Sequence, residues 1–109
     1  MKEKVNKVQL AGNLGRDPQI REFAPNKKMA RFSIAIPEYT TNALGETVPQ
    51  IQWHNAVAWG KTAELVEKTL SKGKEVIVNG RLSSRTYTGK DGVKKYSTDI
   101  VVNDFQVLN

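Results

Sequence analysis

The chain has 109 residues, a formal net charge of +6 and no cysteine. This length fits one domain, and 39% hydrophobic with 26% charged residues is the composition of a soluble globular protein. The lack of cysteine excludes disulfides, thiolate metal sites and a cysteine nucleophile. No apolar run approaches the roughly 18 residues of a membrane-spanning helix, and the N-terminal residues lack the apolar region of a signal peptide. We therefore expect one domain over residues 1–109.

The positive charge narrows the class of partner. The sequence pI is about 9.7. A basic domain attracts polyanions, of which nucleic acid is the first choice and an acidic lipid surface the second. The alternative is that the excess charge serves only to keep the protein in solution. Composition by itself leaves both interpretations open.

Hydrophobic periodicity predicts mostly strands. Apolar and polar residues alternate with a period of two in five places, and one stretch has the period of an amphipathic helix. In chain order, the predicted elements are strands over 7–14, 31–36 and 51–59, a helix over 61–73, and strands over 76–82 and 97–108.

Turn-forming residues separate these elements. Pro37 ends the second predicted strand, and the segment 38–50 has no periodicity, so we expect a mobile loop there. Gly73 stands where a C-terminal helix cap is expected. The segment 86–96 is typical of a hairpin tip, with Gly89 and Asp91-Gly92 in the turn.

Five strands with one helix between the third and the fourth is the element order of an OB-fold, an all-β, five-stranded Greek-key barrel. A single antiparallel sheet that carries one helix is the competing architecture. Gly12 and Gly15 lie where the first predicted strand would bend, and tight curvature needs residues without a side chain. This placement favours the barrel.

An enzyme finds little support in the sequence. His54 is the only histidine and has no second imidazole to complete a metal site. The glycines are scattered rather than gathered in a phosphate-binding loop. Asp99 and Asp104 lack the pattern that would raise the pKa of a catalytic carboxyl. We therefore predict no catalytic residue, no metal and no cofactor.

The segment QWHNAVAWGK (52–61) holds both tryptophans of the chain. In a strand, residues of one parity share a face, so Trp53 and Trp59 point one way while His54 and the alanines at 56 and 58 point the other. Two indoles about 20 Å apart along one strand suit two stacking platforms on one surface. The alternative is that both rings belong to the core.

Basic residues are interleaved with these aromatics. Arg81, Arg85 and Tyr87 share one parity of the fourth predicted strand, and Arg31 projects from the second. Six lysines lie near the helix ends and the hairpin, namely Lys61, Lys72, Lys74, Lys90, Lys94 and Lys95. Cations that hold phosphates beside rings that stack on bases form a groove for single-stranded nucleic acid. The alternative for each lysine is a solvated surface charge.

Four segments resemble the bacterial single-stranded DNA-binding protein family. They are VNKVQLAGNLGRDPQIR (5–21), QWHNAVAWGKTAEL (52–65), LSKGKEVIVNGRL (70–82) and YSTDIVVN (96–103). The resemblance runs from about Val5 to Leu108. It implies an OB-fold that forms a homotetramer and coats single-stranded DNA, without sequence preference, during replication, recombination and repair. It also implies a cytoplasmic, nucleoid-associated protein that is not an enzyme.

The resemblance also implies roles for particular residues. The stacking aromatics of the family correspond to Trp53, Trp59 and Tyr87, and His54 corresponds to a histidine near a subunit interface. Where the family has a fourth stacking tryptophan, this chain has Tyr39-Thr40. Tyr39 is the candidate substitute, but it lies one residue earlier than the family tryptophan. Strand parity would then point its side chain in a different direction from that tryptophan. Matching phosphate contacts are Lys7, Lys61, Lys72 and Arg85. The predicted DNA-binding residues are Lys7, Arg31, Tyr39, Trp53, Trp59, Lys61, Lys72, Arg81, Arg85 and Tyr87.

One departure and several alternatives accompany this resemblance. The family continues into a long linker with an acidic tip that recruits other proteins, whereas these residues stop at Asn109. Tail-mediated recruitment of replication and repair enzymes is therefore doubtful. Alternatives are a replication-restart accessory protein, an OB module for protein or oligosaccharide, and a small nuclease. RNA is a further candidate ligand, because stacking and phosphate contacts need no 2′-hydroxyl.

Overall fold

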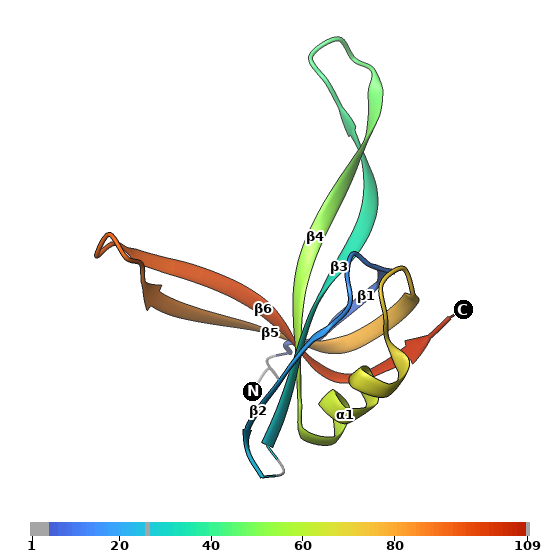
Figure 1. Cartoon of the computed structure of the whole chain (residues 1–109). Helices are drawn as coiled ribbons and strands as arrows, with labels where there is room; N and C mark the ends of the chain where they lie inside the picture. The colour runs from blue at the N-terminus through green and yellow to red at the C-terminus, as the bar shows by residue number, and fades with distance from the viewer. Residues whose placement is uncertain (1–4, 26, 109) are drawn as a thin grey trace.

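The computed structural model describes residues 5–25 and 27–108, and these form six strands and one helix (Figure 1). The elements are β1 (Val8–Leu14), β2 (Gln19–Ala24), β3 (Lys27–Thr41), β4 (Thr47–Trp59), α1 (Gly60–Thr69), β5 (Glu75–Thr88) and β6 (Lys94–Val107).

Five of the strands close into a barrel. The order across the sheet is β1-β5-β6-β4-β3-β2, and β1 also pairs with β3, which joins the two sides of the sheet. The pairing of β4 with β6 is parallel and the others are antiparallel, so the barrel is mixed. α1 lies between β4 and β5, as an OB-fold requires. The predicted barrel is confirmed, and the single open sheet is wrong.

The core fills the barrel and the space under α1. Every strand of the barrel sends alternate apolar side chains inward, as the period of two predicts. α1 buries Ala63 and Val66 completely. Its outer side is tied to β3 by Lys28 Nζ, 2.7 Å from Glu67 Oε1, and this carboxylate raises the pKa of Lys28. The buried cluster is Leu14, Ala30, Phe32, Ile34, Ala56, Ala58, Ala63, Val66, Leu70, Val76, Val78, Ile100 and Val102.

Two strand glycines lie where neighbouring strands approach closely. A Cβ on Gly12 would lie 2.8 Å from Ile34 Cγ2 and would overlap the Ala35 carbonyl oxygen. A Cβ on Gly80 would lie 2.9 Å from the Val101 carbonyl carbon, next to an irregularity in the β5–β6 register. Both distances are shorter than van der Waals contact. Neither position has room for a side chain, which agrees with the sequence-based expectation for Gly12; Gly80 was not singled out from the sequence.

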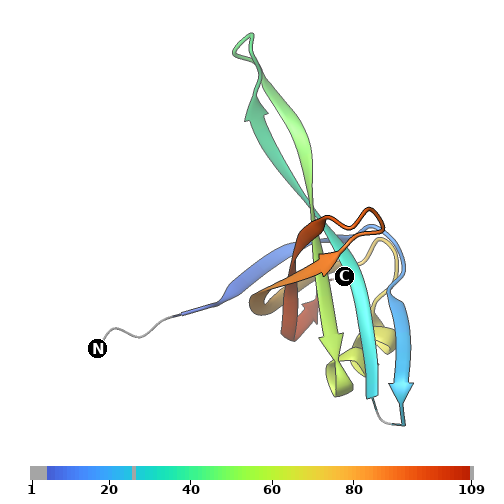
Figure 2. The ribbon, with the colours of Figure 1, turned by 90° about the vertical axis from the view of Figure 1, so that its left-hand side faces the viewer.

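The segment 38–50, predicted to be a mobile loop, is instead most of a long hairpin. β3 continues through Pro37 to Thr41, and β4 begins at Thr47 (Figures 1 and 2). The hairpin extends beyond the barrel (Figure 2). The pairing of β3 with β1 ends at Ala35, so Pro37 lies on a segment with one free edge, where proline is tolerated. At the tip, Asn42 Oδ1 accepts hydrogen bonds from two backbone N–H groups.

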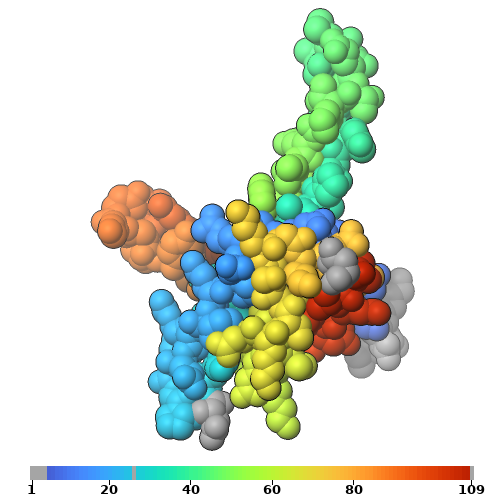
Figure 3. Space-filling view, turned by 45° about the vertical axis from the view of Figure 1, so that its right-hand side comes forward, coloured from blue at the N-terminus to red at the C-terminus, as the bar shows by residue number. Residues whose placement is uncertain are grey.

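Other predicted boundaries also shift. β2 was not predicted, and α1 ends at Thr69 rather than at 73, because Leu70 is already extended. The turn between β5 and β6 covers 89–93, so this hairpin is paired nearly to its tip. Asp91-Gly92 does lie in the turn. Both hairpins stand clear of the central body in the space-filling view (Figure 3).

Candidate nucleic-acid interface

The β3–β4 ladder places both tryptophans on the outside of the barrel. Its register is unbroken from Met29↔Trp59 to Thr41↔Thr47, so no bulge disturbs the alternation of faces. Trp53 is 58% exposed and Trp59 is 52% exposed. The alanines at 56 and 58, of the other parity, are completely buried. The alternative that both indoles belong to the core is wrong.

An open cleft of about 330 Å³ lies beside Trp59 and is called the Trp59 cleft below. Neighbouring strands β2, β3, β4, β6 and β5 each contribute side chains from their outer faces. Its lining residues are Arg21, Phe23, Met29, Arg31, Val57, Trp59, Ser83, Arg85, Asp99 and Val101. The Trp59 cleft therefore exists only when these five strands are paired side by side.

One wall of the Trp59 cleft is aromatic. The Phe23 ring stacks on Trp59 with centroids 6.0 Å apart and an interplanar angle of 24°. The guanidinium carbon of Arg21 lies 5.9 Å from the centroid of the Phe23 ring. Phe23 is 55% exposed, so the pair offers apolar faces to solvent. Flat rings with exposed faces suit stacking on nucleobases.

The rest of the Trp59 cleft combines cations with an apolar floor. Val57 is 5% exposed and Val101 is partly buried, and they lie side by side because β4 and β6 pair at these residues. Arg31 from β3 and Arg85 from β5 line the cleft from opposite sides of this floor. Three arginines and one carboxylate line the cleft, so its charge is positive. A positive cleft attracts a polyanion.

Trp53 lines a second hollow of about 320 Å³ with Gly15, Arg16 and Ser33. A smaller hollow of about 190 Å³ shares Arg16 and Ser33 with it and shares Arg31 with the Trp59 cleft. The three hollows therefore join through shared residues into one track from Trp53 to Trp59. The track has an indole at each end and arginines between them, a combination that suits a single strand of nucleic acid.

Gly15 positions Trp53. A Cβ at this residue would lie 2.6 Å from Trp53 Cη2 and would overlap the ring still more at a neighbouring carbon. We expect Gly15→Ala to displace the exposed indole and to weaken DNA binding by up to the roughly 1–3 kcal/mol of one stacked base. A double-mutant cycle with Trp53→Ala, measured by DNA titration, checks this result. In the Trp53→Ala background, Gly15→Ala should have no further effect.

The other predicted residues lie at various distances from this track. Tyr39 is 74% exposed on the β3–β4 hairpin, and the unbroken register puts it on the face of Trp53, so its role in place of the family tryptophan stays a prediction. Arg81 and Tyr87 share the outer face of β5 with Arg85, and Tyr87 is 48% exposed. These residues extend the track onto the two hairpins.

Three predicted lysines lie outside the three hollows of the track. The backbone N–H of Lys72 donates to Asp17 Oδ1 at 2.8 Å, which holds the lysine beside the turn that follows Gly15. Lys61 is exposed in the first turn of α1. Lys7 precedes β1, where its neighbour Asn6 is hydrogen-bonded to the backbone of Leu82. Their contacts with DNA stay predictions.

Sequence reasoning missed Arg16, Arg21 and Phe23. The last two lie on β2, which was not predicted, and Phe23 sits at an irregularity in the β2–β3 register. The available signal was an aromatic residue two positions after an arginine, between Pro18 and Pro25.

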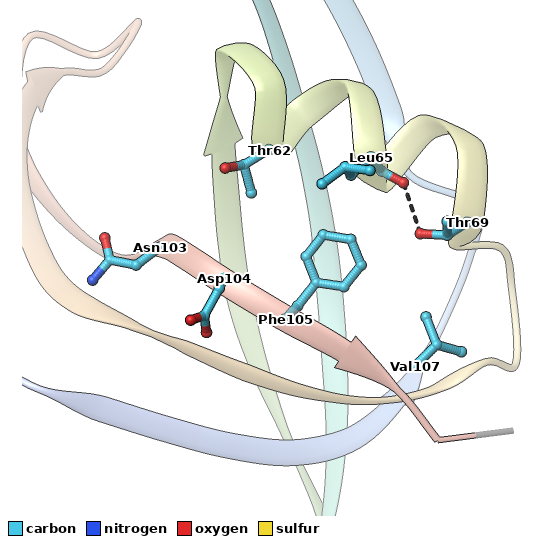
Figure 4. Close-up of a pocket in the computed structure, with 7 residues that line it drawn as sticks. All are labelled: Thr62, Leu65, Thr69, Asn103, Asp104, Phe105 and Val107. Atoms are coloured by element: carbon cyan, nitrogen blue, oxygen red, sulfur yellow. Dashed lines mark hydrogen bonds between the residues drawn. The ribbon is translucent and has the colours of Figure 1, made fainter.

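A further cavity of about 310 Å³ lies between α1 and the end of β6 (Figure 4). Leu65 and Phe105 point into it from the two sides, and Thr69 Oγ1 is occupied by a hydrogen bond to the Leu65 carbonyl. Of the described residues that line it, Asp104 is charged and none is basic. This cavity does not suit a polyanion.

In 5–25 and 27–108, no group of three or more histidine, aspartate or glutamate residues could hold a metal ion. The one described helix, α1, is too short and too polar to cross a membrane.

Comparison with known proteins gives concordant results. The profile of the single-strand binding protein family matches residues 5–108. "Single-stranded DNA-binding protein 1" of Chlorobaculum tepidum is 41% identical over 105 residues, which cover 95% of this chain and 65% of the relative. The single-stranded DNA-binding protein of Xanthomonas campestris pv. campestris is 41% identical over 104 residues, with coverage of 95% and 60%. The chain therefore spans less than two thirds of the length of these relatives.

A solved structure is similar over the whole chain. The protein in the "Plasmodium falciparum SSB complex with ssDNA" aligns with a TM-score of 0.87 and 32% sequence identity, and the alignment covers 100% of both chains.

Proposed function

We propose that this chain, which belongs to the single-strand binding protein family, binds single-stranded DNA and coats it with little regard to sequence. The observation that carries the proposal is the continuous track of exposed indoles and arginines between Trp53 and Trp59. The similar Plasmodium falciparum protein was solved with single-stranded DNA, which supports it. Residues 1–109 would act as one binding domain.

The proposed mechanism divides the work between two kinds of side chain. Trp53, Trp59, Tyr87 and Tyr39 stack on splayed bases, which is tolerant of sequence because every base has an apolar face. The basic residues along and beside the track hold phosphates. They are Lys7, Arg31, Lys61, Lys72, Arg81 and Arg85, to which the structure adds Arg16 and Arg21. Neither step changes a covalent bond, in keeping with a family of binding proteins rather than enzymes.

Such a coat would protect single strands and remove their secondary structure during replication, recombination and repair. It would act in the cytoplasm, on the DNA of the nucleoid. The bacterial relatives named above are single-stranded DNA-binding proteins, which supports this assignment.

The test is a titration with poly(dT), duplex DNA and RNA at two salt concentrations. We expect tight binding to poly(dT) and weak binding to duplex, whose bases cannot reach the indoles. If about four to six phosphates are neutralised per subunit, log K against log salt should have a slope near −3 to −4. Equal affinity for duplex, or a flat response to salt, would contradict the proposal. Binding of RNA as tight as poly(dT) would widen the ligand class.

A homotetramer is the proposed assembly. His54 lies on the side of β4 that carries the buried alanines but stays partly exposed itself, next to the point where the hairpin leaves the barrel. We expect His54→Tyr to overpack a subunit contact there and to favour dissociation on dilution. Light scattering at micromolar concentration checks the state. A wild-type monomer would contradict the tetramer, and an equally stable His54→Tyr tetramer would remove His54 from the interface.

A further inference from the structure

The Trp59 cleft contains a group that phosphate binding does not explain. Asp99 of β6 is only 8% exposed and is the one buried polar or charged residue among those described. It lines a cleft in which three arginines would otherwise attract phosphate. A buried carboxylate is unfavourable unless its charge is compensated, so its presence at this position calls for donors.

The donors that Asp99 has within the protein are weak. Oδ2 lies 3.5 Å from Arg85 Nε, and Oδ1 accepts a hydrogen bond from Ser97 Oγ at 3.5 Å. Both distances are at the long limit for hydrogen bonds. An ionised carboxylate offers about four acceptor positions. Asp99 therefore keeps the capacity to accept further hydrogen bonds from a ligand in the cleft.

The surroundings of Asp99 define that ligand. Val57 and Val101 give the cleft an apolar floor, and Trp59 with Phe23 gives it an aromatic wall. A phosphate beside the carboxylate would meet a like charge, so phosphates belong at the arginines and not above Asp99. A flat, neutral ring suits these surroundings, because its apolar faces can contact the floor and the aromatic wall while N–H donors on its edge reach Asp99. A nucleobase is such a ring.

We infer that the Trp59 cleft binds one nucleobase with its donor edge toward Asp99, so that this position favours guanine over thymine. Guanine carries adjacent donors, N1–H and the 2-amino group, which match the two oxygens of a carboxylate. Thymine has one N–H between two carbonyl oxygens, and these would face the negative charge. Carboxylates also accept hydrogen bonds from the amino group of cytosine. This preference rests on the proposed function, since it requires DNA in the cleft.

The experiment compares guanine with hypoxanthine, which lacks only the 2-amino group. The probes are thymidine oligonucleotides in which every third base is guanine or hypoxanthine, plus the unmodified oligonucleotide. Spacing the purines avoids runs that fold on themselves. We expect wild-type protein to bind the guanine probe at least about fivefold more tightly than the hypoxanthine probe, because one hydrogen bond to a charged acceptor is lost.

Asp99→Asn tests the residue, and Asp104→Asn is the matched control. Asp104 lies on the same strand outside the cleft, where Oδ1 accepts a hydrogen bond from Asn79 at 2.8 Å, so its variant removes an equal charge. We expect the guanine-to-hypoxanthine ratio to fall to near one in Asp99→Asn and to persist in Asp104→Asn. If both variants bound all three probes more tightly than wild type, that shared gain would reflect the lost negative charge and not the contact between Asp99 and the base.

Each outcome separates the inference from the function beneath it. Equal wild-type affinity for the guanine and hypoxanthine probes, with tight binding of the unmodified oligonucleotide, would overturn the inference and leave the proposed function intact. A ratio that persists in Asp99→Asn would overturn the role of Asp99. Failure to bind any of the three probes would overturn both. The wild-type comparison needs no variant, so it decides the matter even if Asp99→Asn does not fold.

Discussion

Changing Trp53 and Trp59 together to alanine is expected to weaken binding of single-stranded DNA by about 2–6 kcal/mol, since each stacked base contributes roughly 1–3 kcal/mol. This corresponds to a loss of about thirtyfold to twenty-thousandfold in affinity. Both side chains are more than half exposed, so the melting temperature should change little. Stacking and folding are thereby separable in this protein.

The measurement uses two signals. In wild type, poly(dT) should quench intrinsic fluorescence strongly, because these are the only two tryptophans. Each single variant keeps one indole and assigns its share of the quenching. The double variant has no tryptophan, so its affinity is measured by the anisotropy of a labelled oligonucleotide.

A matched control is available on α1. Leu65 is 53% exposed, like the two indoles, but lies outside the track, so Leu65→Ala should leave DNA affinity unchanged. A large loss of thermal stability in the tryptophan variants, with normal DNA affinity, would mean that the rings serve packing and not stacking.

The barrel could be predicted because its strands obey a local rule. Where a strand has one face inside the core, alternation is strict, as in the run from Phe32 to Ile36. Gly12 added the second clue, because it lies where a side chain would meet a neighbouring strand. Both signals come from burial, and burial is what the sequence pattern records.

The hairpin arms and β2 could not be predicted for the same reason. Beyond the barrel, β3 and β4 are exposed on both faces, so nothing selects apolar residues at alternate positions. Within the described part of the chain, β2 pairs with β3 alone, and it exposes almost all of its residues. Their backbone pairing depends on the neighbouring strand rather than on their own composition. Without a buried face, a strand has no period to detect.

In the candidate site, too, features within one strand could be predicted, whereas features that depend on pairing between strands could not. Parity within β4 was enough to put Trp53 and Trp59 on one surface. The partners of Trp59 come from strands that are distant in sequence, and the register that unites them is set by tertiary pairing. Asp99 was considered only as a catalytic acid. Its burial and its nearness to Arg85 appear only when β5 and β6 are paired.

Gly80→Ala is expected to lower the free energy of unfolding by about 1–3 kcal/mol, the range for an overpacked interior. The added Cβ would overlap the Val101 carbonyl oxygen and lie 3.2 Å from Ile100 Cγ2. The backbone of β6 cannot swing aside as a flexible side chain would. For a domain near 100 residues, each kcal/mol lowers the melting temperature by roughly 4–8 °C. Thermal unfolding followed by circular dichroism gives the measurement.

Gly89→Ala is the matched control for this substitution, because it makes the same chemical change on the same side of the β5–β6 hairpin. A Cβ there meets the ends of the Asp91 and Lys95 side chains, which can move, so the melting temperature should stay near that of wild type. The two variants also differ in function. Val101 forms part of the floor of the Trp59 cleft, so a shift of its backbone in Gly80→Ala should also weaken DNA binding below the melting transition. If Gly80→Ala had the melting temperature and the DNA affinity of wild type, β5 and β6 would not approach each other as closely as the barrel requires.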